Sequence, residues 1–308
     1  MKYVFFATRE LGAEVLKALL KADYSPALVV TMPDKPAGRK KELKASPVKL
    51  TAQEHNLPLA QPEDIRELLS DDRVTTADLF VVAAYGGMLP QELLDIPPDK
   101  VLNVHPSLLP LYRGPAPERA TLLAGDKKTG VTVMLLDSKI DHGPILAQKE
   151  YAIPRDIRHE ELHEELGILG GKLLVEVLPK WLSENITPKE QDHSKATFTK
   201  KATKEDGKID WKAPADYIVR QIQAYDPWPG TYTFWNAKLL KILEANAADF
   251  AEYAPFEPGA TFSLKGEPAV MTGKGALVLQ KVQLEGKNPS SAKDFLLGHK
   301  DFLGTTLH

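Results

Sequence analysis

The chain has 308 residues, of which 26% are charged and 43% hydrophobic, and it carries a formal net charge of -3. This length is sufficient for two domains, and the charge excludes broad electrostatic adhesion to nucleic acid, so that any RNA contact must be local. The absence of cysteine excludes disulfides, thiolate metal sites and cysteine nucleophiles, while no apolar run resembles a signal peptide or a membrane span, which indicates a cytoplasmic protein.

The first half of the chain alternates strand-like and helix-like segments. The expected strands are 3–7, 27–31, 79–84 and 145–153, and the expected helices are 11–20, a segment opening at Pro47, and 158–179. Such alternation is typical of a parallel sheet wrapped by helices. We therefore predict an α/β fold with a Rossmann-like open sheet.

The most informative segment is a strand end that carries an amide and an imidazole. Residues 101–105 alternate like a strand, so Asn103 and His105 should point to the same face and share one cleft. An asparagine offers two N–H donors that suit a developing oxyanion, and a histidine donates or accepts a proton near neutral pH. This pair indicates acyl chemistry that needs no metal.

A carboxylate follows the next apolar run. Asp141 comes shortly after residues 131–136, and a carboxylate beside His105 would hold the ring as a proton donor or order a proton-carrying water. An isolated Asn-x-His also fits a hydrogen-bonded turn. The loop after it, rich in proline and glycine, favours function, because ligands bind in loops at strand ends of open α/β sheets.

The last third of the chain has a different spacing of apolar residues. Residues 183–208 lose apolar periodicity, and short apolar runs separated by turn residues follow, which predicts a small β-barrel. We expect a catalytic domain at 1–186, a linker at 187–207 and a C-terminal domain at 208–308.

These motifs resemble the 10-formyltetrahydrofolate-dependent formyltransferases. Their signature is Asn-x-His, then Ser-Leu-Leu-Pro, then Asp-x-Gly, which Asn103, His105, 107–110, Asp141 and Gly143 match. Further segments are similar to the methionyl-tRNA formyltransferase family, so that the match spans nearly the whole chain: Thr31–Arg39, Ser46–Lys49, Ile209–Trp211, Asp226–Gly230 and Gln283–Lys287.

The resemblance implies formyl transfer from 10-formyltetrahydrofolate to the α-amine of initiator methionyl-tRNA by a monomeric, metal-independent enzyme. Asn103, His105 and Asp141 would be catalytic. The second domain would be an OB-like barrel that binds tRNA. The resemblance assigns folate binding to Tyr85, Gly86, Gly87, Met88, Ser107, Leu108, Leu109 and Pro110. It assigns tRNA binding to Arg39, Lys40, Lys41 and Lys44.

Three alternatives remain open. His159 to His163 matches His-Glu-x-x-His, the pattern of zinc metalloproteases, although its acidic surroundings favour a solvated helix start. A formyltransferase acting on an amino sugar or on glycinamide ribonucleotide would share the catalytic residues. A non-enzymatic RNA-binding protein would leave them unexplained. One departure from the family is Ala7-Thr8-Arg9, where Gly-Thr-Pro is common after the first strand.

Overall fold

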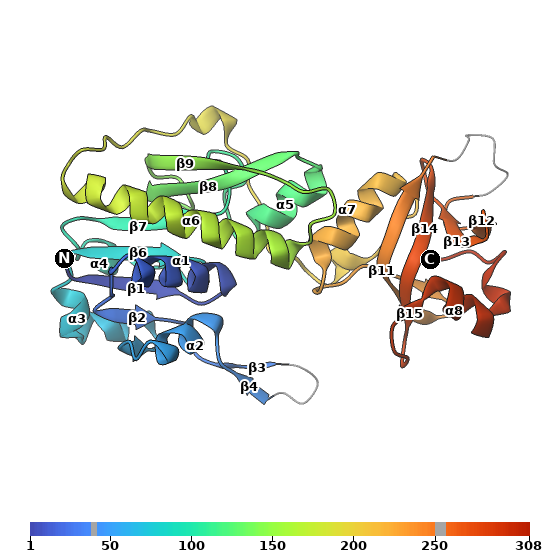
Figure 1. The fold of residues 1–308 in the computed structure, drawn as a ribbon, viewed down its shortest axis with the longest axis horizontal. Coiled ribbons are helices and arrows are strands. Elements are labelled where there is room, and N and C mark those ends of the chain that lie inside the picture. Colours follow the sequence, from blue (N-terminus) through green and yellow to red (C-terminus); the bar gives the residue numbers. More distant parts are fainter. Residues whose placement is uncertain (38–41, 250–256) are drawn as a thin grey trace. The chain divides into compact units, whose positions relative to one another are not determined.

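The computed structural model describes residues 1–37, 42–249 and 257–308, and the chain forms two compact units (Figure 1). Unit 1 contains Met1–Glu118, Lys127–Pro154 and Glu161–Lys200. Unit 2 contains Arg119–Asp126, Arg155–Glu160 and Lys201–His308. Among the described residues, no helix combines the length and the apolar character that crossing a membrane requires.

Unit 1 is built on a seven-stranded sheet with the order β5-β2-β1-β6-β7-β8-β9. The first five of these strands are parallel, whereas β8 runs antiparallel to both β7 and β9. The strands are β1 Tyr3–Ala7, β2 Leu28–Val30, β5 Leu59–Ala60, β6 Leu79–Ala83, β7 Val101–His105, β8 Lys128–Leu135 and β9 Ile145–Ala152. The predicted Rossmann-like α/β sheet is confirmed.

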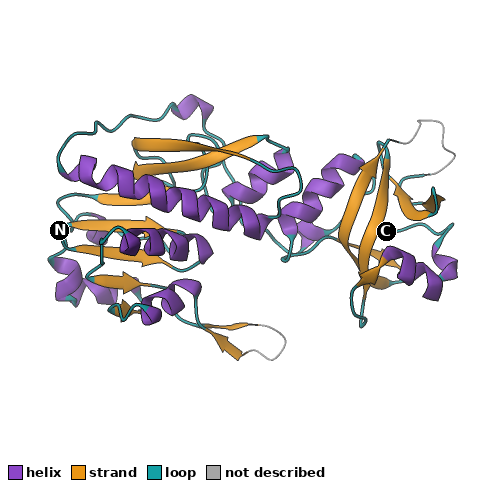
Figure 2. Cartoon of the chain, in the orientation of Figure 1, coloured by secondary structure: helices purple, strands orange, loops and turns teal. Residues whose placement is uncertain are grey.

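Helices pack on this sheet (Figure 2), with α1 and α6 on the same face. The helices of the first two thirds of the chain are α1 Glu10–Lys21, α2 Pro47–Glu54, α3 Asp72–Thr75, α4 Gln91–Leu94, α5 Pro117–Ala124 and α6 His159–Leu182, with short 3-10 helices at Ile65–Ser70 and His193–Lys195. The helix expected to open at Pro47 is confirmed, with Ser46 as its N-cap, since the Ser46 hydroxyl accepts from the Lys49 amide.

Glycines let α6 approach its neighbours closely. A Cβ on Gly170 would lie 2.6 Å from Val104 Cγ1, and a Cβ on Gly171 would lie 2.6 Å from the Ala18 Cβ of α1. Real Cβ atoms essentially never come so close to another heavy atom. Because Val104 lies between Asn103 and His105 in β7, the position of α6 bears directly on the strand that carries these two residues.

Replacing Gly170 with leucine is therefore expected to destabilise the protein by about 1–3 kcal/mol, the usual cost of overpacking a dense core. Leucine has the higher helix propensity, but that gain is below about 1 kcal/mol. Thermal and urea unfolding would measure the change. The matched control is Lys172→Leu on the exposed side of the same helix, which should be near neutral. Equal stabilities of the two variants would show that α6 can move freely away from the sheet.

A two-stranded hairpin, β3 Lys35–Ala37 and β4 Glu42–Lys44, follows β2 and extends from unit 1 in Figure 1. Its base is held by Asp34, whose carboxylate accepts from Lys49 Nζ at 2.6 Å and from Gln61 Nε2 at 2.8 Å. These two partners hold the pKa of Asp34 below its usual range. Gln61 also donates to the Met32 carbonyl at 2.9 Å, so the segment that leads into the hairpin is held at both Met32 and Asp34.

Unit 2 contains a curled antiparallel half-barrel, which confirms the predicted small OB-like barrel. The strand order is β10-β11-β14-β13-β12, and β15 pairs with β14. Its elements are β10 Tyr232–Trp235, β11 Lys238–Ala248, β12 Thr261–Leu264, β13 Glu267–Met271, β14 Ala276–Leu284, β15 Ser290–Ser291, α7 Ala215–Tyr225 and α8 Ala292–Gly298, with 3-10 helices at Glu205–Gly207 and Lys300–Phe302.

Two features were not foreseen from the sequence. Helix α7 buries Ile218, Ile222 and Tyr225, whose spacing of four and three is a helical pattern within a region predicted only as strands and turns. Residues 187–200, expected to be part of a linker, belong to unit 1 and pair with it through Lys189 and Phe198. The domain boundaries given above stay a prediction.

Candidate active site

The carboxyl end of β7 positions the first two predicted catalytic residues. Asn103 and His105 are 7% and 4% exposed, and they pair through their backbones with Met134 and Thr132 of β8. Among the residues that the structure describes, the Asn103 side-chain amide has no hydrogen-bond partner within the protein. An almost buried amide with unused donors is suited to a ligand oxygen.

Each nitrogen of the His105 imidazole has an oxygen atom beside it. Nε2 lies 3.1 Å from the Tyr112 carbonyl oxygen, to which it donates, and Nδ1 lies 3.5 Å from Asp141 Oδ1. A carbonyl can only accept, so this contact fixes the proton on Nε2 and leaves Nδ1 as the nitrogen that exchanges a proton. The distance of 3.5 Å to Asp141 is long for a hydrogen bond, so the carboxylate acts on the ring as a nearby negative charge.

Asp141 is held by a backbone amide of the loop after β7. Its Oδ2 accepts from the Gly114 N–H at 2.7 Å. Gly114 has φ +109°, and a Cβ there would lie 2.8 Å from the Thr199 carbonyl oxygen, so this position requires glycine. The structure thus brings Asn103, His105 and Asp141 to the same edge of the sheet, although Asp141 lies on a different loop.

The loop 107–111 is fixed by its own hydrogen bonds. The Ser107 hydroxyl donates to the Leu111 carbonyl at 2.7 Å, and the Thr132 hydroxyl donates to the Ser107 carbonyl at 2.7 Å. Gln148 Nε2 donates to the Leu109 carbonyl at 2.9 Å. The Ser107 side chain therefore shapes the loop, and the folate contacts predicted for residues 107–110 stay a prediction.

The second loop of the predicted folate site follows β6. Tyr85 is buried against Phe6, with ring centroids 5.7 Å apart, and burial raises its pKa to about 12, so its hydroxyl stays protonated near neutral pH. Gly86 has φ +89°, which turns the chain sharply, and Met88 is exposed. Since β6 and β7 are parallel neighbours, this loop lies at the same sheet edge as the catalytic residues.

Thr8 fixes the loop that contains Tyr85. It belongs to the Ala7-Thr8-Arg9 turn, which differs from the Gly-Thr-Pro that is common in the family. Its hydroxyl donates to the Tyr85 carbonyl at 2.7 Å and accepts from the Met32 amide at 3.2 Å. Behind it, the hydroxyls of Thr31 and Ser46 lie 2.9 Å apart. One threonine thus joins the ends of β1, β2 and β6.

Replacing Thr8 with valine is expected to raise the KM for the formyl donor by about 2- to 10-fold, which corresponds to a net hydrogen-bond contribution of about 0.5–1.5 kcal/mol. Valine keeps the shape but cannot hold the Tyr85 carbonyl. Steady-state kinetics with the donor varied would measure this, with the exposed Thr75→Val as the control. A KM equal to that of the parent would mean that the Tyr85 loop holds its shape without Thr8.

The His-Glu-x-x-His motif has a local structural explanation. His163 Nδ1 lies 2.6 Å from Glu118 Oε1, and both residues are almost fully buried. This contact joins α6 to the start of α5 within unit 1. A buried carboxylate and imidazole in contact compensate each other's burial, so a structural role accounts for His163.

The structure describes one of the four residues predicted to bind tRNA. Arg39, Lys40 and Lys41 lie outside the described residues, whereas Lys44 is exposed at the end of β4.

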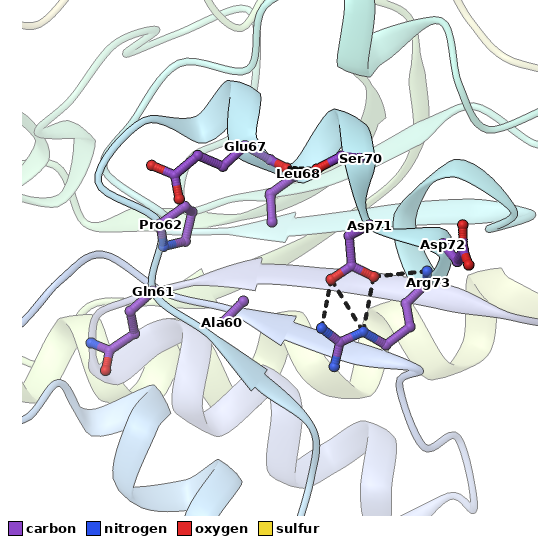
Figure 3. A pocket seen from close by; sticks show the side chains of 9 residues that line it. All are labelled: Ala60, Gln61, Pro62, Glu67, Leu68, Ser70, Asp71, Asp72 and Arg73. Atoms are coloured by element: carbon purple, nitrogen blue, oxygen red, sulfur yellow. Dashed lines mark hydrogen bonds and ion pairs between the residues drawn. The ribbon is translucent and has the colours of Figure 1, made fainter.

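A cavity of about 630 Å³ lies elsewhere in unit 1 (Figure 3), where Arg73 pairs with Asp71. It is lined by Ala60, Gln61, Pro62, Glu67, Leu68, Ser70, Asp71, Asp72 and Arg73, and it includes none of the candidate site residues.

Comparison with known proteins finds relatives over the whole chain. Residues 1–178 match the formyl transferase family, and residues 201–300 match the formyl transferase C-terminal domain. A methionyl-tRNA formyltransferase of Chloroflexus aurantiacus is 45% identical over 98% of both chains. That of Caldanaerobacter subterraneus subsp. tengcongensis is 38% identical over 100% of both.

Solved structures share the fold at lower identity. The sugar 3N-formyltransferase WlaRD, determined in the presence of dTDP and 5-N-formyl-THF, has a TM-score of 0.67 at 17% identity and covers 94% of this chain and 99% of its own. HypX from Aquifex aeolicus, determined in complex with tetrahydrofolic acid, has a TM-score of 0.62 at 17% identity, covering 96% of this chain and 47% of that one. The chain belongs to the formyltransferase family and groups with its methionyl-tRNA formyltransferases.

Proposed function

We propose that this chain transfers a formyl group from 10-formyltetrahydrofolate to the α-amine of initiator methionyl-tRNA. The observation that carries the proposal is the group of side chains at the carboxyl edge of the sheet: the amide of Asn103, which has no partner among the described residues, the imidazole of His105, and the carboxylate of Asp141 3.5 Å from it. Full-length similarity to methionyl-tRNA formyltransferases supports the acceptor. We expect the enzyme to act as a monomer in the cytoplasm.

The reaction proceeds through a tetrahedral intermediate. The amine nitrogen attacks the formyl carbon, the C–N10 bond then breaks, the amine loses a proton and N10 gains one. An α-amine has a reference pKa of about 8, so a useful fraction is unprotonated near pH 7 and no strong base is needed. Most of the acceleration therefore comes from alignment and from stabilising the developing charge.

The three residues have different roles in this scheme. Asn103 donates to the oxyanion that forms on the formyl oxygen. His105, anchored through Nε2 to the Tyr112 carbonyl, uses Nδ1 to assist proton transfer to N10. Asp141, anchored through Oδ2 to the Gly114 amide, keeps Oδ1 free to support His105 and to take the proton from the amine.

The substrates would enter from two sides of this set. We assign the folate to the loop 85–88 and to residues 107–110, and the acceptor end of the tRNA to the hairpin base at Lys44 and to Arg39, Lys40 and Lys41. Lysine and arginine contacts to phosphate would position the tRNA without reading its sequence.

The test is a transfer assay with the formyl donor and three parallel acceptors: methionyl-tRNA, uncharged tRNA and an amino sugar. Formylation of methionyl-tRNA alone is expected. Transfer to the amino sugar alone would keep the catalytic residues and overturn the acceptor, and no transfer to any of the three would overturn the proposal.

A further inference from the structure

The segment 189–199, here called the brace, runs along the two loops that carry the active site. Lys189 pairs with Ile145 through N–H···O contacts of 2.7 and 2.8 Å. The Arg113 amide donates to the Thr197 carbonyl at 2.8 Å, and the Thr199 amide donates to the Arg113 carbonyl at 2.7 Å. The backbone of the brace is therefore attached to the start of β9, directly after the Asp141 loop, and to the loop after β7.

One buried side chain of the brace connects the two loops. Gln191 is 5% exposed, and its Nε2 donates to the carbonyl of Asp141 at 2.9 Å and to the carbonyl of Gly143 at 2.7 Å. Its Oε1 accepts from Arg113 Nη2 at 2.6 Å and from Nε at 3.1 Å. All these groups belong to unit 1.

The arrangement requires an amide in a single orientation. A guanidinium can only donate, so Arg113 turns Oε1 toward itself and directs both N–H groups of Gln191 to the two carbonyls. Arg113 is itself 3% exposed, and its Nη2 also lies 2.8 Å from His193 Nδ1. A glutamate at position 191 would accept from Arg113 equally well but could not donate to the carbonyls.

The backbone that Gln191 holds is an unusual one. Asp141 has φ +46°, a left-handed conformation that aspartate and asparagine adopt more readily than other non-glycine residues but that is still less favourable than the right-handed regions. The loop is also confined at Gly143, where a Cβ would lie 2.1 Å from the Leu135 carbonyl oxygen. The direction of the Asp141 side chain, toward His105 and the Gly114 amide, depends on this backbone.

We propose that Gln191 is a positioning residue for Asp141, and that it acts with Arg113 by fixing the backbone from which the carboxylate projects. The inference rests on the catalytic role proposed for Asp141. A displacement of about 1 Å at a reacting group can cost about 100-fold in rate, so a residue that never touches substrate can control turnover.

The test is kinetic and uses Gln191→Glu, which keeps the acceptor for Arg113 and removes the two donors. We expect kcat to fall by about 10- to 100-fold while KM for the donor and for the acceptor change less than twofold. The control is Asp192→Ala, the next residue of the brace, which should keep parent kinetics. Among the described residues, its carboxylate contacts Ser194 and Lys195 and neither loop of the active site.

A double-mutant cycle separates positioning from general weakening of the fold. In an Asp141→Asn background, Gln191→Glu should lower kcat further by less than twofold, because the group it positions is already altered. A full additional loss in that background, or a kcat of Gln191→Glu within twofold of the parent, would overturn the proposal.

A structural readout keeps this inference distinct from the proposed function. Crystal structures of the parent and Gln191→Glu should differ at Asp141, with φ leaving the left-handed region and the carboxylate leaving the Gly114 amide. If the parent transfers no formyl group, the proposed function fails, and the structures decide whether Gln191 positions Asp141. An unchanged Asp141 in the variant would overturn the positioning role itself.

Discussion

Replacement of Asn103 with alanine is expected to lower kcat by about 100- to 1000-fold, the usual cost of losing one oxyanion donor. The side-chain amide has no hydrogen-bond partner among the described residues, so its removal leaves no other protein group unsatisfied. The backbone pairs of Asn103 with Val82 and Met134 remain. The loss should therefore fall on turnover, and stability should change little.

Single-turnover formylation of methionyl-tRNA would measure this effect, and a urea melt would confirm that the variant is folded. The matched control is Asn185→Ala, an exposed asparagine whose side-chain amide donates to the Ser183 hydroxyl. A folded Asn103→Ala enzyme with turnover within a few fold of the parent would remove Asn103 from the mechanism.

The second large effect is expected for Asp141→Asn, with kcat lowered by about 100- to 10,000-fold, the range of general acid–base contributions. The change removes the negative charge 3.5 Å from His105 Nδ1. Asparagine tolerates the left-handed backbone at this position as readily as aspartate, and its carbonyl oxygen can still accept from the Gly114 amide. The variant should keep its fold and lose most of its catalytic activity.

A nearby carboxylate provides the control. Asp137 lies five residues before His142 and contacts its Nδ1 at 2.7 Å, so Asp137→Asn also removes one charge from this region without touching His105. We expect its kcat to stay within about threefold of the parent. Comparable losses in both variants would point to a general field effect of negative charge, and a fully active Asp141→Asn would exclude Asp141 from proton transfer.

The main features of the fold could be predicted because they have local signatures. The strand at 3–7 was predicted with the bounds that the structure has, and the predicted helix start at Pro47 is also correct. The strand predicted at 145–153 ends one residue earlier, at Ala152. Apolar runs and a Ser-Pro helix start carry this information within a few residues. The helix α7 carries a comparable signal in the spacing of Ile218, Ile222 and Tyr225, although the short apolar runs that follow it are typical of strands.

The candidate site was predictable only in part. Asn103 and His105 share a strand, so their common face follows from the period of two. Asp141 was identified by its residue type and its place after an apolar run. Neither pattern could indicate that Thr8 ties the Tyr85 loop or that Gly114 holds the Asp141 carboxylate.

The residue pattern alone identifies the available chemical groups: an amide and an imidazole on one strand, and a carboxylate on the loop after a later strand. The contacts that hold these groups are seen only in the folded chain: the Tyr112 carbonyl accepts from His105 Nε2, and Gln191 of the brace connects the two loops. The Gln191 contact joins residues 50 positions apart, and the Tyr112 contact depends on how the loop after β7 folds back on its own strand, so neither follows from a local pattern. The spacing of apolar residues shows which face of a segment is buried and which is exposed. A single hydrogen bond between residues 50 positions apart does not change that spacing and so cannot be predicted from it.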